Sequence, residues 1–341
     1  MLCVRIALTV LVAVMAAPTI GAQELRFKIA TMAPDGTLWM NELRKAADEV
    51  ERRTDGRVGF RFYPGGTMGS DSAVLRKIRI GQLQGGIILA ASLADVYPDV
   101  EIYSLPLLFR SYGEVDFVRK IMDPVLIKGL EDSGFVSFGF TETGFTYLLS
   151  TQPTRTFDDL KGRKAWMPQD DPVSLAIVEQ AGLSPVPLPV SDVLTGLQTG
   201  LINTVAAPPV GIVALQWFTK AKYLTDLPIT YMCGTMVVSS KAFDTMLQED
   251  QRIVREVLGR SIRKLDETSR SDNDQARDAL VKQGVVFVDP TDETRAWWDE
   301  IAAAATKRLV SQRGYDQATL RKVEDLVATC RERQASGQTG G

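Results

Sequence analysis

The chain has 341 residues, and its 39 Lys and Arg against 42 Asp and Glu give a formal net charge of −3. A slightly acidic chain offers no basic surface for phosphates, so we expect no nucleic-acid partner. The sequence contains no histidine, the commonest general base and zinc ligand, which disfavours most hydrolase and zinc chemistry. We expect no metal and no cofactor.

The first 22 residues predict a cleaved signal peptide. Arg5 precedes an apolar run from Ile6 to Ala17, and the small residues Gly21 and Ala22 end the segment. The run is shorter than the roughly 18 residues that a spanning helix needs, and no later run reaches that length. We therefore expect a mature chain in the periplasm. Its two cysteines, Cys233 and Cys330, could pair there or stay free.

Strand and helix patterns alternate along the first part of the chain. Apolar residues at every second position indicate strands, and apolar stripes at helical spacing indicate helices. We predict strands at 25–29, 58–62 and 87–89, separated by helices at 39–50 and 74–78. Repeats of strand and helix predict parallel α/β sheets that are buried on both faces.

The second part repeats this pattern and ends in a long helix. Asp171 before Pro172 predicts a helix N-cap, and Gly182 suits the position just after that helix ends. Ser191 is expected to cap a helix that ends at Gly200, and 201–207 to form a strand. Residues 249–283 predict one helix of roughly 52 Å, which exceeds a single small domain.

Several motifs in fixed order carry a family resemblance. The two most informative are Leu160–Pro168 and Leu197–Pro208, accompanied by Tyr63–Gly69, Leu105–Arg110 and Gly182–Pro187. In order and spacing they resemble the DctP-like solute receptors of tripartite ATP-independent periplasmic (TRAP) transporters. The resemblance covers nearly all of the mature chain.

The resemblance implies a two-domain α/β fold of the type II periplasmic-binding-protein kind, TRAP receptor subtype, with a long helix spanning both domains. Domain I would comprise 24–143 plus 232–271, and domain II 144–231 plus 272–330, followed by a disordered tail at 331–341. A solute would bind in the cleft between the domains, and membrane permease subunits would be the partners. Monomer and dimer both stay open.

The chain departs from the family pattern at the expected cleft. The arginine that clamps a substrate carboxylate in the family corresponds to Trp166, and its frequent helper arginine corresponds to Thr146. The family's Glu-Asn pair corresponds to Ala206-Ala207, which precede Pro208 in this chain. The aromatic residue that often follows the family's proline-rich turn corresponds to Val190. Because polar and charged features are lost together, the sequence favours a hydrophobic or weakly polar ligand.

Other candidate contacts each have a structural alternative. Trp166 could instead pack in the core. Gln169 is the favoured polar contact because it follows the site strand, whereas Asp171 and Asp71 could be helix caps. The remaining candidates are Trp39 and Trp217, which could be core residues, and Gly234, which would enlarge the cavity.

Three functions are weighed, with the transport receptor favoured. An acid could still bind in an unorthodox site, with Arg110 or Lys164 supplying the charge. A receptor that presents its closed form to a membrane sensor is a second class. An enzyme is disfavoured, because no nucleophile with a base, metal cluster or phosphate loop is visible; Gly65–Gly69 lacks the lysine of a P-loop.

Overall fold

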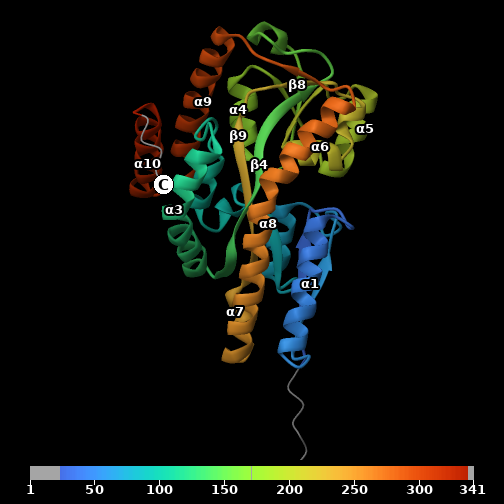
Figure 1. Cartoon of the computed structure of the whole chain (residues 1–341), viewed down its shortest axis with the longest axis vertical. Coiled ribbons are helices and arrows are strands. Elements are labelled where there is room, and N and C mark those ends of the chain that lie inside the picture. The colour runs from blue at the N-terminus through green and yellow to red at the C-terminus, as the bar shows by residue number, and fades with distance from the viewer. Residues whose placement is uncertain (1–23, 170, 337–341) are drawn as a thin grey trace, which may run out of the picture.

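The computed structural model describes residues 24–169 and 171–336, which form two α/β lobes (Figure 1). The predicted signal peptide, Asp170 and the last five residues of the expected tail lie outside the described residues. Within those ranges, no helix combines the length and apolar character needed to cross a bilayer. The strands join into a sheet of order β2-β1-β3-β9-β4-β7-β5-β6, and β8 and β10 pair beside β4.

Lobe I contains the first five strands of this order. Strands β2 and β3 pair with β1 in parallel, whereas β9 pairs antiparallel with both β3 and β4. Helices α1 and α2 follow β1 and β2, as the alternating pattern predicts. The elements are β1 (Leu25–Thr31), α1 (Leu38–Arg53), β2 (Val58–Tyr63), α2 (Asp71–Arg79), β3 (Gly85–Leu89), η1 (Ala91–Asp95), η2 (Pro98–Ser104), α3 (Tyr112–Asp132), β4 (Phe135–Ser150), β9 (Thr230–Ser239) and α7 (Ser240–Phe243).

Lobe II uses the far end of β4 as its first strand. Strand β7 pairs antiparallel with β4, and β5 pairs in parallel with β6 and β7. Its elements are η3 (Phe157–Leu160), β5 (Lys164–Met167), α4 (Pro172–Gln180), β6 (Ser184–Pro187), η4 (Val190–Asp192), α5 (Val193–Thr199), β7 (Thr204–Ala207), α6 (Pro209–Ala214), η5 (Trp217–Thr219), β8 (Tyr223–Thr225), β10 (Val286–Val288) and α9 (Asp292–Arg313).

Helix α8 (Gln248–Lys282) runs along both lobes, as Figure 1 shows. It packs on α1 in lobe I, on α6 in lobe II and on β4 between them. Its 35 residues agree with the predicted helix to within one residue at each end. The two-lobed α/β fold with a long helix spanning both lobes is therefore confirmed.

A backbone irregularity marks the passage of β4 from one lobe to the other. The pairing with β9 shifts between Glu142 and Gly144, and Gly144 has a φ of 110°, which side-chain-bearing residues rarely adopt. Asn273 of α8 donates from Nδ2 to the Thr143 carbonyl at 2.8 Å and accepts from the Val210 amide at 3.2 Å. One side chain thus ties the crossing strand to α6.

The C-terminal segment differs from the expected domain boundaries. Helix α10 (Gln317–Ala335) packs on α3 of lobe I instead of on lobe II, where residues up to 330 were expected. Arg331, expected to begin a disordered tail, lies in this helix and donates from Nε to Glu114 at 3.0 Å. The return buries Leu320, Val323 and Val327 of α10 in the cluster that contains the apolar residues of α3, and Arg331 supplies the cation that the buried Glu114 requires.

Smaller expectations are corrected or completed as well. Ser191 does not cap α5: the helix begins at Val193, and the Ser191 hydroxyl donates to its neighbour Asp192. Gly200 ends α5 in a left-handed conformation, as predicted. Cys233 and Cys330 are free thiols and both are buried.

Candidate functional site

The carboxyl ends of the parallel strands of the two lobes point toward each other. β3 runs in the same direction as β4, because both pair antiparallel with β9, so β1, β2 and β3 all end toward lobe II. β7 runs against β4, so β7, β5 and β6 end toward lobe I. Ligands of open α/β sheets bind beyond the carboxyl ends of strands, which places the candidate site between the lobes.

The loops at these six strand ends share one electrostatic property. The segments 32–37, 64–70, 90–97, 168–171, 188–192 and 208–209 contain no lysine and no arginine. Their charged residues are all aspartates. The loops themselves therefore provide acceptors and apolar groups but no cation. The cations that reach them come from helices of lobe I: Arg44 of α1 pairs with Asp35, and the Lys77 ammonium of α2 donates to the Met68 carbonyl at 2.7 Å.

Trp166 lies in the core of lobe II, on the face covered by α5 and α6. Its ring packs edge-on against Trp217, with centroids 5.1 Å apart, and its Nε1 donates to the Leu188 carbonyl at 2.9 Å. Trp217 is 1% exposed and Trp166 8%. The contacts of Trp166 therefore include core packing, and a ligand contact through its remaining exposed surface stays a prediction.

Three further candidates join the same apolar cluster or its edge. Ala207, the last residue of β7, is buried on the Trp166 face, and Pro208 follows it as the N-cap residue of α6. Val190 begins η4 and packs half-buried against this cluster. Ala206 points to the opposite face of the sheet, where it packs half-buried against the core that both lobes share. The structure thus brings the lobe II candidates together around small apolar side chains.

Asp71 is the first residue of α2, but Ser70 is the N-cap residue of that helix. The Asp71 carboxylate accepts from the Leu89 amide at 3.1 Å and so connects α2 to the end of β3. Burial raises the pKa of Asp71 from 3.8 to about 6, against smaller lowering effects from the Leu89 amide and the Ser92 hydroxyl. No charged side chain among the described residues contributes to this shift.

The raised pKa of Asp71 predicts how stability depends on pH. A raised carboxyl pKa means that the folded state holds the proton more tightly, so this stabilisation is complete below about pH 4 and is lost as pH rises through about 6. We expect Asp71→Asn to raise the free energy of unfolding by about 1–2 kcal/mol at pH 7.5 and to change it little at pH 4.

Urea denaturation at both pH values measures this difference. The control is Asp192→Asn, which changes an exposed aspartate in a strand-end loop of lobe II and should leave the pH dependence unchanged. Destabilisation by Asp71→Asn at pH 7.5 would show that the ionised carboxylate has a stabilising partner.

The loop after β5 carries the other polar candidates. Asp171 is the N-cap of α4, as predicted: its Oδ1 accepts from the amides of Val173 and Ser174 at 3.0 and 3.1 Å. Burial raises the pKa of Asp171, while the Ser174 hydroxyl is the largest opposing influence. Gln169 is exposed and makes no hydrogen bond within the described ranges, so its side chain is available to a solute.

Thr146 and Gly234 lie in the strands that connect the lobes. The Thr146 hydroxyl is 2.6 Å from that of Thr230, so its hydrogen bond is made within the β4–β9 pair. A Cβ at Gly234 would lie 2.8 Å from the Ile88 carbonyl oxygen, so the close approach of β3 accounts for this glycine. Trp39, near the start of α1, is half-buried against the core of lobe I.

Sequence reasoning missed three apolar side chains beside the strand ends of lobe I. Leu38 begins α1 and is 72% exposed. Met68 is half-buried after β2, and Met32 after β1 lies so close to Gly66 that a Cβ there would be 3.1 Å from its sulfur. Flexible thioethers suit surfaces that adapt to apolar partners. Their positions in the sequence, shortly after predicted parallel strands, could have indicated these residues as candidates.

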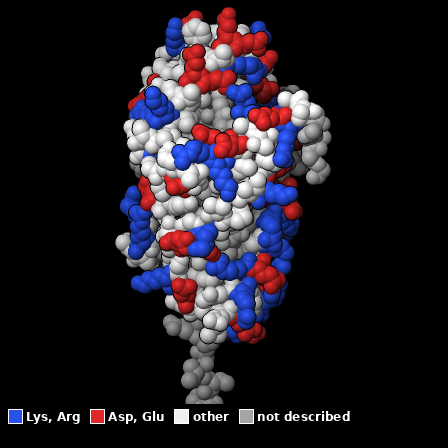
Figure 2. Space-filling model, turned by 90° about the vertical axis from the view of Figure 1, so that its left-hand side faces the viewer, with Lys and Arg blue, Asp and Glu red and all other residues white. Residues whose placement is uncertain are grey.

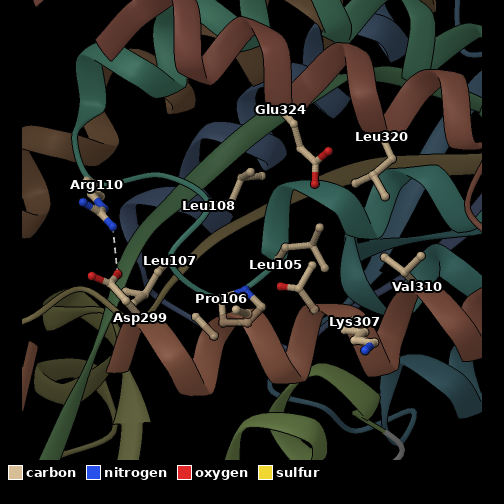
Figure 3. Close-up of a pocket in the computed structure, with 13 residues that line it drawn as sticks. Leu105, Pro106, Leu107, Leu108, Arg110, Asp299, Lys307, Val310, Leu320 and Glu324 are labelled. Carbon is tan, nitrogen blue, oxygen red and sulfur yellow. Dashed lines mark hydrogen bonds and ion pairs between the residues drawn. The ribbon is translucent and has the colours of Figure 1, made fainter. Parts of the chain in front are cut away.

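A groove of about 690 Å³ lies elsewhere, between α9, α10 and the loop 105–110 (Figure 3). Leu105, Leu107, Leu108, Val310 and Leu320 line it, with the Arg110–Asp299 ion pair at one end. It lies apart from the candidate residues of the strand ends. In the part of the chain that the structure describes, no group of three or more Cys, Asp or Glu side chains could hold a metal.

The two-lobed sheet, the crossing helix and facing strand ends define an extracytoplasmic solute-binding protein. The family model described as bacterial extracellular solute-binding protein, family 7 (DctP), matches residues 29–313, and the chain belongs to this family of TRAP solute receptors. The family is one of solute-binding receptors.

Known relatives agree with this assignment. The chain is 25% identical to the C4-dicarboxylate-binding periplasmic protein DctP of Rhodobacter capsulatus over 263 residues, 75% of this chain and 78% of that protein. It is 26% identical to the 2,3-diketo-L-gulonate-binding periplasmic protein YiaO of Escherichia coli, over 69% and 71% of the two chains. A TRAP periplasmic solute-binding protein of Desulfovibrio salexigens with bound orotic acid shares the fold, with a TM-score of 0.81 at 20% identity, over 90% of this chain and 100% of that one.

Proposed function

We propose that this receptor binds a hydrophobic or weakly polar small molecule between its lobes, in the periplasm, and delivers it to the permease subunits of a TRAP transporter. The observation that carries the proposal is the composition of the strand-end loops, which contain no cation, together with the tryptophan at the family's arginine position. A carboxylate taken from water into such a site would lack a charge partner, which costs several kcal/mol.

The apolar side chains at the strand ends favour an apolar ligand. Lobe I supplies Leu38, Met32 and Met68 beside its strand ends, and β7 of lobe II ends in small apolar residues. Burial of apolar ligand surface stabilises a complex by roughly 25 cal/mol per Å², so 200 Å² contributes about 5 kcal/mol before ordering costs. Gln169 and the aspartates add acceptors for a hydroxyl or amine.

The relatives provide the competing candidate, because their names and titles state acids such as C4-dicarboxylates and orotic acid. An acid here would need a cation, and both cations considered from the sequence lie outside the strand-end loops. Arg110 is paired with Asp299 at 2.7 Å, and Lys164 begins β5 at the end that points away from lobe I. The apolar or weakly polar class is therefore preferred.

Mass spectrometry of the small molecules that copurify with the mature chain tests the ligand class. We expect an apolar or weakly polar compound in near-stoichiometric amount, and no rise in melting temperature with succinate or orotate. Copurification of a small dicarboxylate, or a clear rise in melting temperature with either acid, would overturn the proposal.

Trp166→Arg, which restores the family's cation, extends the same experiment. We expect it to lose the copurifying compound and to gain stabilisation by succinate. Phe157→Arg is the matched control, because it adds the same charge at a surface position outside the strand ends. Circular dichroism confirms that each variant is folded before binding is compared.

A further inference from the structure

Helix α9 belongs to lobe II, and its C-terminal end approaches lobe I. It packs on α4 of lobe II, where Arg308 forms an ion pair with Glu179. Its C-terminal residue, Arg313, reaches lobe I instead, and the chain then crosses to α10 through 314–316. The end of α9 is therefore a place where a lobe II element meets lobe I through charged side chains.

Glu101 in η2 of lobe I is the main partner of Arg313. The Arg313 Nε donates to Glu101 Oε2 at 3.0 Å, and the Tyr315 hydroxyl donates to the same oxygen. The guanidinium also lies 3.4 Å from Asp95 Oδ1. Glu101 is 0% exposed, and its second oxygen, Oε1, has no hydrogen-bond partner within the described ranges. A fully buried carboxylate thus depends on one arginine and one hydroxyl.

Arg313 also acts on the candidate site. Its charge is among the influences that lower the pKa of Asp171, which burial raises, and Asp171 in turn contributes to the raised pKa of Glu101. Asp171 caps α4 directly after the β5 loop. The fully buried Glu101 of lobe I and the half-buried Asp171 of lobe II are therefore both attracted by the same arginine.

We propose that Arg313 is an interlobe latch, which holds the present arrangement of the lobes by joining Glu101 of lobe I to the Asp171 end of the candidate site. Movement of lobe II relative to lobe I must break or rebuild this pair. A solute group that approaches Asp171 changes the electrostatic attraction between Asp171 and Arg313. The latch therefore couples solute binding to the arrangement of the lobes. The inference does not depend on the chemical class of the solute.

The surroundings of α9 explain why this pair dominates. The other ion pair between α9 and lobe I, Arg110–Asp299, is 56% and 51% exposed and contributes little. Between the two pairs α9 lines one side of the groove of Figure 3, with Ala302, Thr306 and Val310 among its residues there, and the loop 105–110 of lobe I lines the other. Figure 2 shows the corresponding face, with charges of both signs around an uncharged area.

Double electron-electron resonance on the mature chain, without added solute, tests the latch. Spin labels at Ile80→Cys in lobe I and Leu201→Cys in lobe II occupy exposed positions, whereas Cys233 and Cys330 are buried. In the unsubstituted protein we expect one narrow distribution of distances between the two spin labels. Arg313→Gln should broaden this distribution and add a second maximum. Arg308→Gln, on the same helix but paired within lobe II, should leave the distribution unchanged.

A companion variant separates the latch from simple unfolding. Arg313→Gln leaves Glu101 buried without a cation, so we also measure Arg313→Gln with Glu101→Gln, which removes both charges. The double variant should fold and still show the broader distribution. An unchanged distribution in the double variant, or an equal change in Arg308→Gln, would overturn the latch and leave the proposed ligand class untouched.

Discussion

Trp217→Ala is expected to lower the free energy of unfolding by about 3–5 kcal/mol. Trp217 is among the largest fully buried side chains and packs edge-on against Trp166, so its removal leaves a cavity beneath the residue at the family's arginine position. Such aromatic pairs add about 0.5–1.5 kcal/mol beyond area burial. Urea denaturation followed by far-ultraviolet circular dichroism measures the loss without relying on tryptophan emission.

Phe218→Ala is the matched control for this cavity. Phe218 is the next residue along η5 but only half-buried, with the Lys222 ammonium 5.8 Å from its ring centroid. We expect it to cost much less than Trp217→Ala. Equal costs for the two variants would mean that the Trp217–Trp166 contact contributes nothing specific to lobe II.

Arg119→Gln is expected to lower the free energy of unfolding by about 2–3 kcal/mol, because the buried Arg119 is the cation of two half-buried carboxylates. Arg119 of α3 donates to Asp266 of α8 at 2.9 Å, to Asp123 at 3.0 Å and to the Tyr231 hydroxyl at 3.1 Å. The Tyr231 hydroxyl in turn donates to Glu142 on β4. This cluster joins a lobe I helix to the crossing strand and the crossing helix.

Arg260→Gln controls for the loss of an arginine from an ion pair. Arg260 of α8 pairs with Glu49 of α1, but its side chain is half exposed, so we expect a change of about 0–1 kcal/mol. Thermal unfolding of the three proteins gives the comparison. A loss below about 1 kcal/mol for Arg119→Gln would show that water replaces the arginine at Asp266.

The sequence predicted those parts of the fold that depend on local patterns. Strong periodicity without proline placed α8 to within one residue, and Asp171 with Gly182 marked the two ends of α4. The return of α10 to lobe I was not predicted, since the ion pair of Arg331 with Glu114 joins residues 217 apart. The amphipathic pattern of a helix shows which of its faces is buried but not against which lobe.

The candidate site was likewise predicted only in part from the sequence. Family motifs located the strand ends, and the missing arginines could be counted from the sequence alone. Whether Trp166 turns toward a solute or toward Trp217 depends on packing against α5 and α6, which no motif encodes. Gly234 shows the same limit: an expected wide cavity is, in the structure, a close contact with the Ile88 carbonyl.

Strand β9 lies between β3 and β4 in the sheet, although β3 precedes it by more than a hundred residues. During synthesis, β3 therefore has an unpaired edge until residues 230–239 have been added, and β4 lacks its lobe I neighbour for the same interval. Such long-range pairing forms slowly, because the loop must close before any ladder hydrogen bond is gained. The first lobe consequently stays unfinished while most of the second is being made, which leaves open strand edges exposed to aggregation in the meantime.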